Sequence, residues 1–166
     1  PLPHLPYEIE ITPKMSFGTG HHETTHMMLS YLDEIDCAQH AVLDFGCGTG
    51  VLAILASRKG AKPVDAIYHD PWSVENSLVN CQRNACPEIQ VSQNSLDTLQ
   101  GPYHIILANI NLNVLLDTLV NLFMLLKSGG SLFLSGILQS DRSTMENALL
   151  TQGFSKISEK TRGNWL

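Results

Sequence analysis

Two periodicities of apolar side chains divide most of the chain into alternating strands and helices. Short apolar runs predict strands over residues 41–44, 64–68, 89–91, 104–109, 131–135 and 154–158, and residues 165–166 open one more. Apolar side chains spaced three or four residues apart predict helices over about 23–33, 51–59, 70–84, 113–127 and 141–152. This alternation predicts a doubly wound α/β fold, with a mostly parallel sheet and helices on both faces.

Residues that favour helix ends support these bounds. Asp70 is a good helix cap, and Pro71 is tolerated at the first helical position because its missing N–H would be unpaired there. Gly60 ends the predicted helix at 51–59, and Gly153 ends the one at 141–152. The run Ser128-Gly129-Gly130 ends the long predicted helix at 113–127.

The most informative stretch is Val42 to Gly50, where a strand ends in a glycine-rich turn and a helix begins at once. Glycine is needed in such a turn because a Cβ would clash with a ligand or forbid the backbone angles. A turn that binds nothing is the plain alternative. Val51 stands where a dinucleotide fingerprint needs its third glycine, and no lysine follows as a phosphate-binding loop requires.

The D-x-G-x-G-x-G form of this stretch resembles the first motif of class I S-adenosylmethionine-dependent methyltransferases. That resemblance implies that the turn, including Gly46, Cys47 and Gly48, lies against the amino-acid end of the cofactor. It also implies that Asp44 accepts a hydrogen bond from the cofactor's ammonium group, directly or through water. Ligands of parallel sheets bind at the carboxyl ends of the strands, so we expect this turn, Tyr68 and Asn109 to meet in one cleft.

Composition narrows the class of protein. The chain has 166 residues, 43% of them hydrophobic and 16% charged, which fits one domain with a buried core. The net charge of −6 argues against a dedicated nucleic-acid surface. None of the four cysteines forms a C-x-x-C pair, and we find no signal peptide or bilayer-spanning stretch. We therefore expect a soluble cytoplasmic protein with reduced thiols, no membrane contact and no direct contact with nucleic acid.

The segment His22 to His26 matches H-E-x-x-H, the motif of zinc proteases. In those enzymes both histidines lie on one face of a helix that is already under way. Here Gly18, Thr19 and Gly20 lie just upstream, so the motif falls at a helix start. We expect no metal site.

Five blocks together resemble, in order, the PrmA family of ribosomal protein L-eleven methyltransferases. They are M-S-F-G-T-G-H-H-E-T-T at 15–25, V-L-D-F-G-C-G-T-G-V-L-A-I at 42–54, D-P-W-S-V-E-N at 70–76, I-L-A-N-I at 106–110 and L-K-S-G-G-S-L-F-L-S-G-I-L at 126–138. The resemblance implies the seven-strand, Rossmann-like sheet of class I methyltransferases, with its last strand incomplete in this chain. It also divides the chain into a linker or lead-in segment, residues 1–14, and an S-adenosylmethionine-binding domain, residues 15–166.

The activity that this resemblance implies is methyl transfer from S-adenosylmethionine to lysine ε-amines and an N-terminal α-amine of ribosomal protein L-eleven. Thr25, Gly46 and Asn109 would contact the cofactor, and Phe17 and Thr19 would lie in the loop that covers it. The side-chain carbonyl of Asn109 would orient the incoming amine. The plain alternative for Asn109 is a turn residue at a strand end.

One departure from the family's pattern affects the cofactor site. The family carries an acidic residue for the ribose hydroxyls at the end of the second strand, where this chain has Tyr68. A phenol cannot accept two hydroxyls as a carboxylate does, although His69 can substitute in part. The sequence therefore predicts weakened or altered cofactor binding.

Three other functions stay open. Tyr68 favours a non-catalytic relative that acts as a binding module. Members of the family carry an N-terminal recognition domain before such a linker, and a reduced paralogue without that domain would favour a methyltransferase with another substrate. A nucleotide-dependent oxidoreductase is opposed by Val51. The oligomeric state is undetermined by the sequence.

Overall fold

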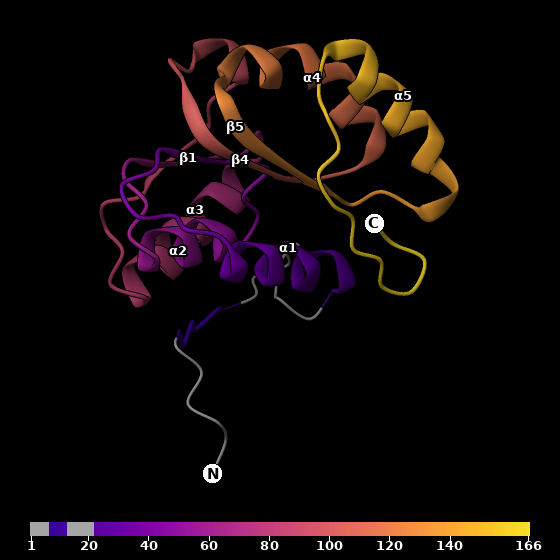
Figure 1. The fold of residues 1–166 in the computed structure, drawn as a ribbon. Helices are drawn as coiled ribbons and strands as arrows, with labels where there is room; N and C mark the ends of the chain where they lie inside the picture. The colour runs from indigo at the N-terminus through magenta and orange to yellow at the C-terminus, as the bar shows by residue number, and fades with distance from the viewer. Residues whose placement is uncertain (1–6, 13–21) are drawn as a thin grey trace.

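The computed structural model describes residues 7–12 and 22–166, which form a parallel sheet between two layers of helices (Figure 1). The strands are β1 (Val42–Phe45), β2 (Val64–Ile67), β3 (Gln90–Ser92), β4 (Tyr103–Asn109) and β5 (Leu126–Ser135), in the spatial order β3-β2-β1-β4-β5. Helices α1 (Glu23–Glu34), α2 (Val51–Arg58) and α3 (Pro71–Arg83) cover one face, and α4 (Leu112–Leu125) and α5 (Arg142–Gln152) cover the other. Short 3₁₀ helices η1 (Leu96–Thr98) and η2 (Gln139–Asp141) complete the elements of these residues. The predicted parallel α/β architecture is confirmed.

The central strands bury side chains on both faces because helices cover both sides of the sheet. In β4, Ile105 and Leu107 join the core under α1 and α2, whereas Ile106 and Ala108 join the core under α4. All four are at most 4% exposed. This explains the unbroken apolar run of the strand and confirms the prediction that it is buried on both faces.

The predicted end of the long helix is wrong by two residues, and the glycines after it lie in a strand. Helix α4 ends at Leu125, and β5 begins at Leu126. Tyr103 pairs with Leu126, but Ile105 pairs with Ser131, so the extra residues of β5 bulge out of the ladder. Gly129, with a φ of +77°, supplies the left-handed conformation that this bulge requires.

The predicted strand at 154–158 is also wrong, because this stretch pairs with no strand in the described part of the chain. Its Lys156 forms surface ion pairs with Glu146 at 2.6 Å and Glu159 at 2.8 Å, and Ile157 is 87% exposed. Phe154 packs against the core, but a strand also needs a partner strand, which this stretch lacks. Trp165 forms isolated antiparallel bridges with Leu138 and Arg162.

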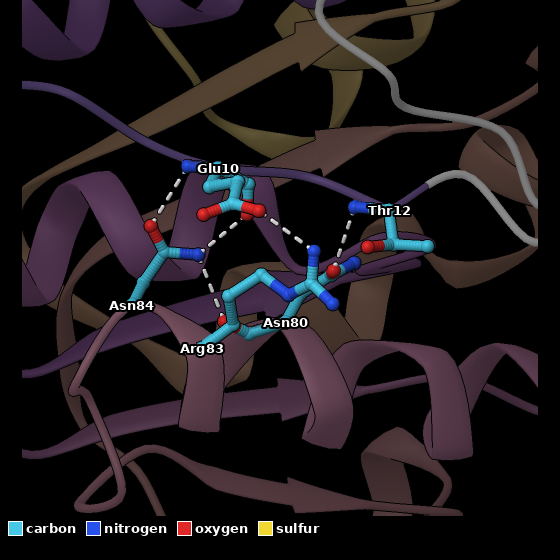
Figure 2. A network of polar contacts seen from close by, with 5 residues as sticks. All are labelled: Glu10, Thr12, Asn80, Arg83 and Asn84. Atoms are coloured by element: carbon cyan, nitrogen blue, oxygen red, sulfur yellow. Dashed lines mark hydrogen bonds and ion pairs between the residues drawn. The ribbon is translucent and has the colours of Figure 1, made fainter.

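Residues 7–12 lie extended beside α3, and we call them the lead-in segment. Its apolar residues Tyr7, Ile9 and Ile11 pack against the core under α1 and α2. Its backbone is held by the side chains of Asn80 in α3 and of Asn84, the C-cap residue of that helix (Figure 2). The segment therefore belongs to the folded body of the protein.

The four cysteines are buried free thiols, as the lack of paired spacing predicts. Among the described residues, none of the helices combines the length and the apolar character that crossing a membrane needs.

Candidate functional site

The sheet has its topological switch point between β1 and β4, because the strand order runs outward from that pair in both directions. Ligands of open parallel sheets bind at the carboxyl ends of the strands flanking such a point. Two sequence-predicted site residues, Phe17 and Thr19, lie outside the described residues. The others are at or beside this edge: Thr25, Asp44, Gly46, Cys47, Gly48, Tyr68, His69 and Asn109.

The turn after β1 has three left-handed residues, Gly46, Gly48 and Gly50, with φ angles of +84°, +54° and +80°. Residues other than glycine rarely adopt these backbone angles. At Gly46 a Cβ would also lie 2.4 Å from Cγ2 of Ile110, in the turn after β4. The glycines thus let the ends of two neighbouring strands, β1 and β4, approach closely.

Helix α3 holds this turn from below with polar side chains. The hydroxyl of Ser77 donates to the carbonyl of Gly48 at 2.8 Å, and it lies 3.3 Å from Sγ of Cys47. The amide nitrogen of Asn80 donates to the carbonyl of Thr49 at 2.9 Å. Because these carbonyls are buried, each needs an internal donor, and α3 supplies one to each.

Sequence reasoning missed this support. It predicted the helix from its cap at Asp70 and Pro71 and assigned no role to the side of α3 under the turn, which is polar. Ser73, Ser77, Asn80 and Asn84 recur at helical spacing, and each is at most 5% exposed. The signal was in the sequence, because small polar residues replace apolar ones at positions 73, 77, 80 and 84.

Asp44 lies in β1 and is 1% exposed. Its Oδ2 accepts a hydrogen bond from the backbone N–H of Ala53 at 3.2 Å, near the start of α2. Burial raises the pKa of Asp44 to about 7, although that hydrogen bond acts in the opposite direction. A cation at the turn would favour the ionised form of this carboxyl group.

Asn109 and Thr25 are brought together from positions 84 residues apart in the chain. Asn109 ends β4, and its Nδ2 donates to the hydroxyl oxygen of Thr25 at 3.2 Å. Thr25 is buried in the first turns of α1. Because the nitrogen of the Asn109 amide faces Thr25, its carbonyl oxygen points elsewhere as a fixed hydrogen-bond acceptor.

The end of β2 presents an aromatic pair where a carboxylate is expected from the family's pattern. Tyr68 is half-buried and stacks on His69, with ring centroids 4.7 Å apart and an interplanar angle of 20°. A ring carbon of Tyr68 lies 3.9 Å from the place that a Cβ of Gly46 would take. Asp70 caps α3, where it accepts from the backbone N–H groups of Trp72 and Ser73. Its carboxylate is thereby engaged at the helix end.

The H-E-x-x-H segment lies at the N-terminus of α1, as predicted. Nδ1 of His22 accepts from the backbone N–H of Thr24 at 3.3 Å, which makes His22 the helix cap. Its ring packs edge-on against Trp165 at 5.2 Å. Within residues 7–12 and 22–166, we find no group of three His, Cys, Asp or Glu side chains that could hold a metal ion.

Comparison with known proteins points to one family. The sequence profile of the family described as ribosomal protein L11 methyltransferase (PrmA) matches residues 5–166. Curated ribosomal protein L11 methyltransferases from Bacteroides fragilis and Porphyromonas gingivalis are 38% and 41% identical to 99% and 98% of this chain. The chain spans only 59% and 57% of the length of these two relatives.

The structural comparison points to the same proteins. The crystal structure of ribosomal protein L11 methylase from Lactobacillus delbrueckii subsp. bulgaricus superposes with a TM-score of 0.88 and 30% sequence identity. The match covers 95% of this chain and 81% of that one. The predicted methyltransferase fold is thus confirmed.

The close approach at Gly46 gives a stability test. Gly46→Ala should lower the free energy of unfolding by about 2–4 kcal/mol, because it adds overpacking against Ile110 to left-handed strain. Gly129→Ala is the matched control, since its φ is +77° and no atom lies within 4 Å of its Cβ position. It should lose only about 1–2 kcal/mol. Urea unfolding measures both losses, and equal losses would mean that the contact with Ile110 is unimportant.

Proposed function

Because the chain belongs to the family of ribosomal protein L11 methyltransferases, we propose that its residues 15–166 bind S-adenosylmethionine and methylate amines of ribosomal protein L11. One observation carries this proposal. The glycine turn, the buried carboxyl of Asp44 and the pair Thr25–Asn109 all lie at the switch point of the sheet. Residues 1–14 then form the lead-in to this domain.

The residues present fit the amino-acid end of this cofactor. Asp44 offers a buried carboxyl whose pKa, raised by desolvation to about 7, leaves it readily ionised by a neighbouring ammonium. The backbone of Gly46, Cys47 and Gly48 can approach a ligand without a Cβ at either glycine. At the next strand end, Tyr68 and His69 are the side chains beside the ribose. Phe17 and Thr19 would contribute from the loop that covers the cofactor.

The chemistry requires few polar groups. When bound, the cofactor supplies a sulfonium methyl group, whose carbon–sulfur bond breaks as a neutral amine forms the new nitrogen–carbon bond. The amine's proton passes to solvent afterwards. Asn109, which is held in place by Thr25, accepts a hydrogen bond from the amine and so directs the lone pair of the amine nitrogen toward the methyl group. Proximity and alignment can supply most of the acceleration, so no general base is needed.

A second candidate function is a relative that binds the cofactor weakly or not at all and acts as a binding module. Tyr68 favours it, because the nearest carboxylate, Asp70, is engaged at the start of α3. A methyltransferase with another substrate is the third candidate. The first two differ in cofactor affinity, and the first and third differ in the methyl acceptor.

The direct test compares three ligands by calorimetry and thermal shift. S-adenosylmethionine and S-adenosylhomocysteine should bind and raise the unfolding temperature by mass action, and NAD should not. Transfer of a labelled methyl group to ribosomal protein L11 should then depend on Asn109, with Asn109→Ala lowering kcat by about tenfold or more. Binding without transfer would favour the binding module, and no binding of either adenosyl compound would refute the enzyme.

Asp44 predicts a pH dependence of cofactor affinity. Its ionised form, needed to accept from the ammonium, grows from a few per cent at pH 5.5 to about half at pH 7, given a pKa of about 7. The Kd of S-adenosylhomocysteine should therefore fall about tenfold over this interval. Asp44→Asn should bind more weakly with a nearly flat profile, because it lacks the carboxyl group whose ionisation the profile follows. Parallel profiles for both proteins would exclude this role.

Tyr68 predicts a gain of affinity on substitution. Tyr68→Asp restores a carboxylate beside the ribose, and a hydrogen bond to a charged group contributes about 1.5–3 kcal/mol, or roughly ten- to a hundredfold in Kd. Tyr68→Asn is the control of equal size without the charge. Titration calorimetry of both variants with S-adenosylhomocysteine decides the matter. If the two bind equally, the ribose has another partner in this protein.

A further inference from the structure

The backbone of the lead-in segment is held by two asparagine side chains: Asn80 in α3 and Asn84, the C-cap residue of that helix (Figure 2). The amide of Asn84 accepts from the backbone N–H of Glu10 at 2.9 Å and donates to the carbonyl of Glu10 at 2.7 Å. Next along the segment, the backbone N–H of Thr12 donates to Oδ1 of Asn80 at 2.9 Å. The ion pair of Arg83 with Glu10 is 2.7 Å long but exposed, so it contributes little.

Asn80 differs from Asn84 in where the other end of its amide binds. Its Oδ1 accepts from Thr12, and its Nδ2 donates to the carbonyl of Thr49 in the glycine turn at 2.9 Å. A flipped amide would place donor against donor and acceptor against acceptor, so the two contacts fix its orientation together. Because Asn80 is fully buried, water cannot replace a bond that is lost.

The side chain of Asn80 therefore connects the lead-in segment to the glycine turn after β1. Thr49 is in the turn proposed to cradle the cofactor. Thr12 immediately precedes residues 13–21, where the predicted cover residues Phe17 and Thr19 stand in the sequence. A shift of the turn moves Nδ2 of Asn80, and the planar amide transmits that shift to Oδ1 and to Thr12.

We propose that Asn80 is a positioning residue that couples ligand binding in the glycine turn to docking of the lead-in segment. A ligand that orders the turn strengthens the bond to Thr12, and by linkage a docked segment raises the affinity of the turn for that ligand by the same factor. The coupling rests on the proposed function only in its choice of S-adenosylhomocysteine as the ligand. The connection between Thr12 and Thr49 is independent of the ligand's identity.

Thr12→Pro tests the coupling, because it removes one backbone N–H at a residue that does not contact the turn. Without its donor, Asn80 loses its anchor, so the Kd of S-adenosylhomocysteine should rise about threefold to tenfold. In an Asn80→Ala background the same substitution should have no further effect. An equal rise in both backgrounds would show that Thr12 acts by another route, for example through residues 13–21, and would overturn the proposal.

Asn84→Ala is the matched control, since it frees Glu10 but leaves both bonds of Asn80. Amide exchange at Glu10 should accelerate in this variant. In Asn84→Ala, amide exchange at Thr12 should still slow when S-adenosylhomocysteine is added. In Asn80→Ala, adding S-adenosylhomocysteine should leave amide exchange at Thr12 unchanged. A merely structural role for Asn80 would loosen the segment in both variants and leave the response to cofactor intact at Thr12.

A measurement without ligand separates this proposal from the proposed function. The N–H of Gly50 is bonded to the carbonyl of Cys47 at 2.7 Å and reports on the turn. The substitution Thr12→Pro should accelerate amide exchange at Gly50 by about threefold or more when it is the only change. In a protein that already carries Asn80→Ala, it should cause no further acceleration. If Asn80→Ala does not fold, Asn80→Ser takes its place. If amide exchange at Gly50 is unchanged in Thr12→Pro, the proposed coupling is overturned, even if the cofactor binds. If the cofactor does not bind, the exchange measurement still tests the coupling, because it needs no ligand.

Discussion

Buried carbonyl groups in a tight turn must find hydrogen-bond donors inside the protein, and this requirement shapes the site. Gly48 and Thr49 lie in the turn between β1 and α2, and the carbonyls of both are buried. Ser77 and Asn80 supply the missing donors. Helix α3 therefore gives up apolar contacts on one side, which lowers hydrophobic stabilisation but fixes the backbone where a ligand must approach it.

The electrostatics of the site follow from the same geometry. Asp44 is carried into the interior by β1, where its carboxyl group binds the N–H of Ala53 at the start of α2. Gly50, at the end of the turn, has no side chain to cap that helix. The strand thus provides the cap that the glycine cannot, and places an ionisable group with a raised pKa directly beneath the turn. Helix capping and ligand recognition are in this way served by one residue.

The sequence predicted the order of elements and the edge of the sheet at which the candidate residues meet. Strand and helix periodicities are local properties. The caps are local as well, because Asp70 acts through its side chain on the next few residues, and Pro71 and Gly153 act through their own backbone conformations. The bulge in β5 and the unpaired stretch at 154–158 depend on partner strands, which local patterns do not reveal. The polar side of α3 was missed for a related reason, because its meaning appears only when the carbonyls of the turn and Glu10 are placed beside it. The roles of the cofactor residues stay predictions.

The amide of Asn84 pairs with Glu10 as one peptide group pairs with another, through a donor and an acceptor side by side. Such a contact recognises the main chain and is indifferent to the side chain that the residue carries. Over evolutionary time the lead-in segment is therefore free to drift in sequence, provided that proline is avoided at positions 10 and 12 and that positions 7, 9 and 11 stay apolar. The requirement for particular side chains therefore falls on Asn80 and Asn84 and not on the segment that they hold.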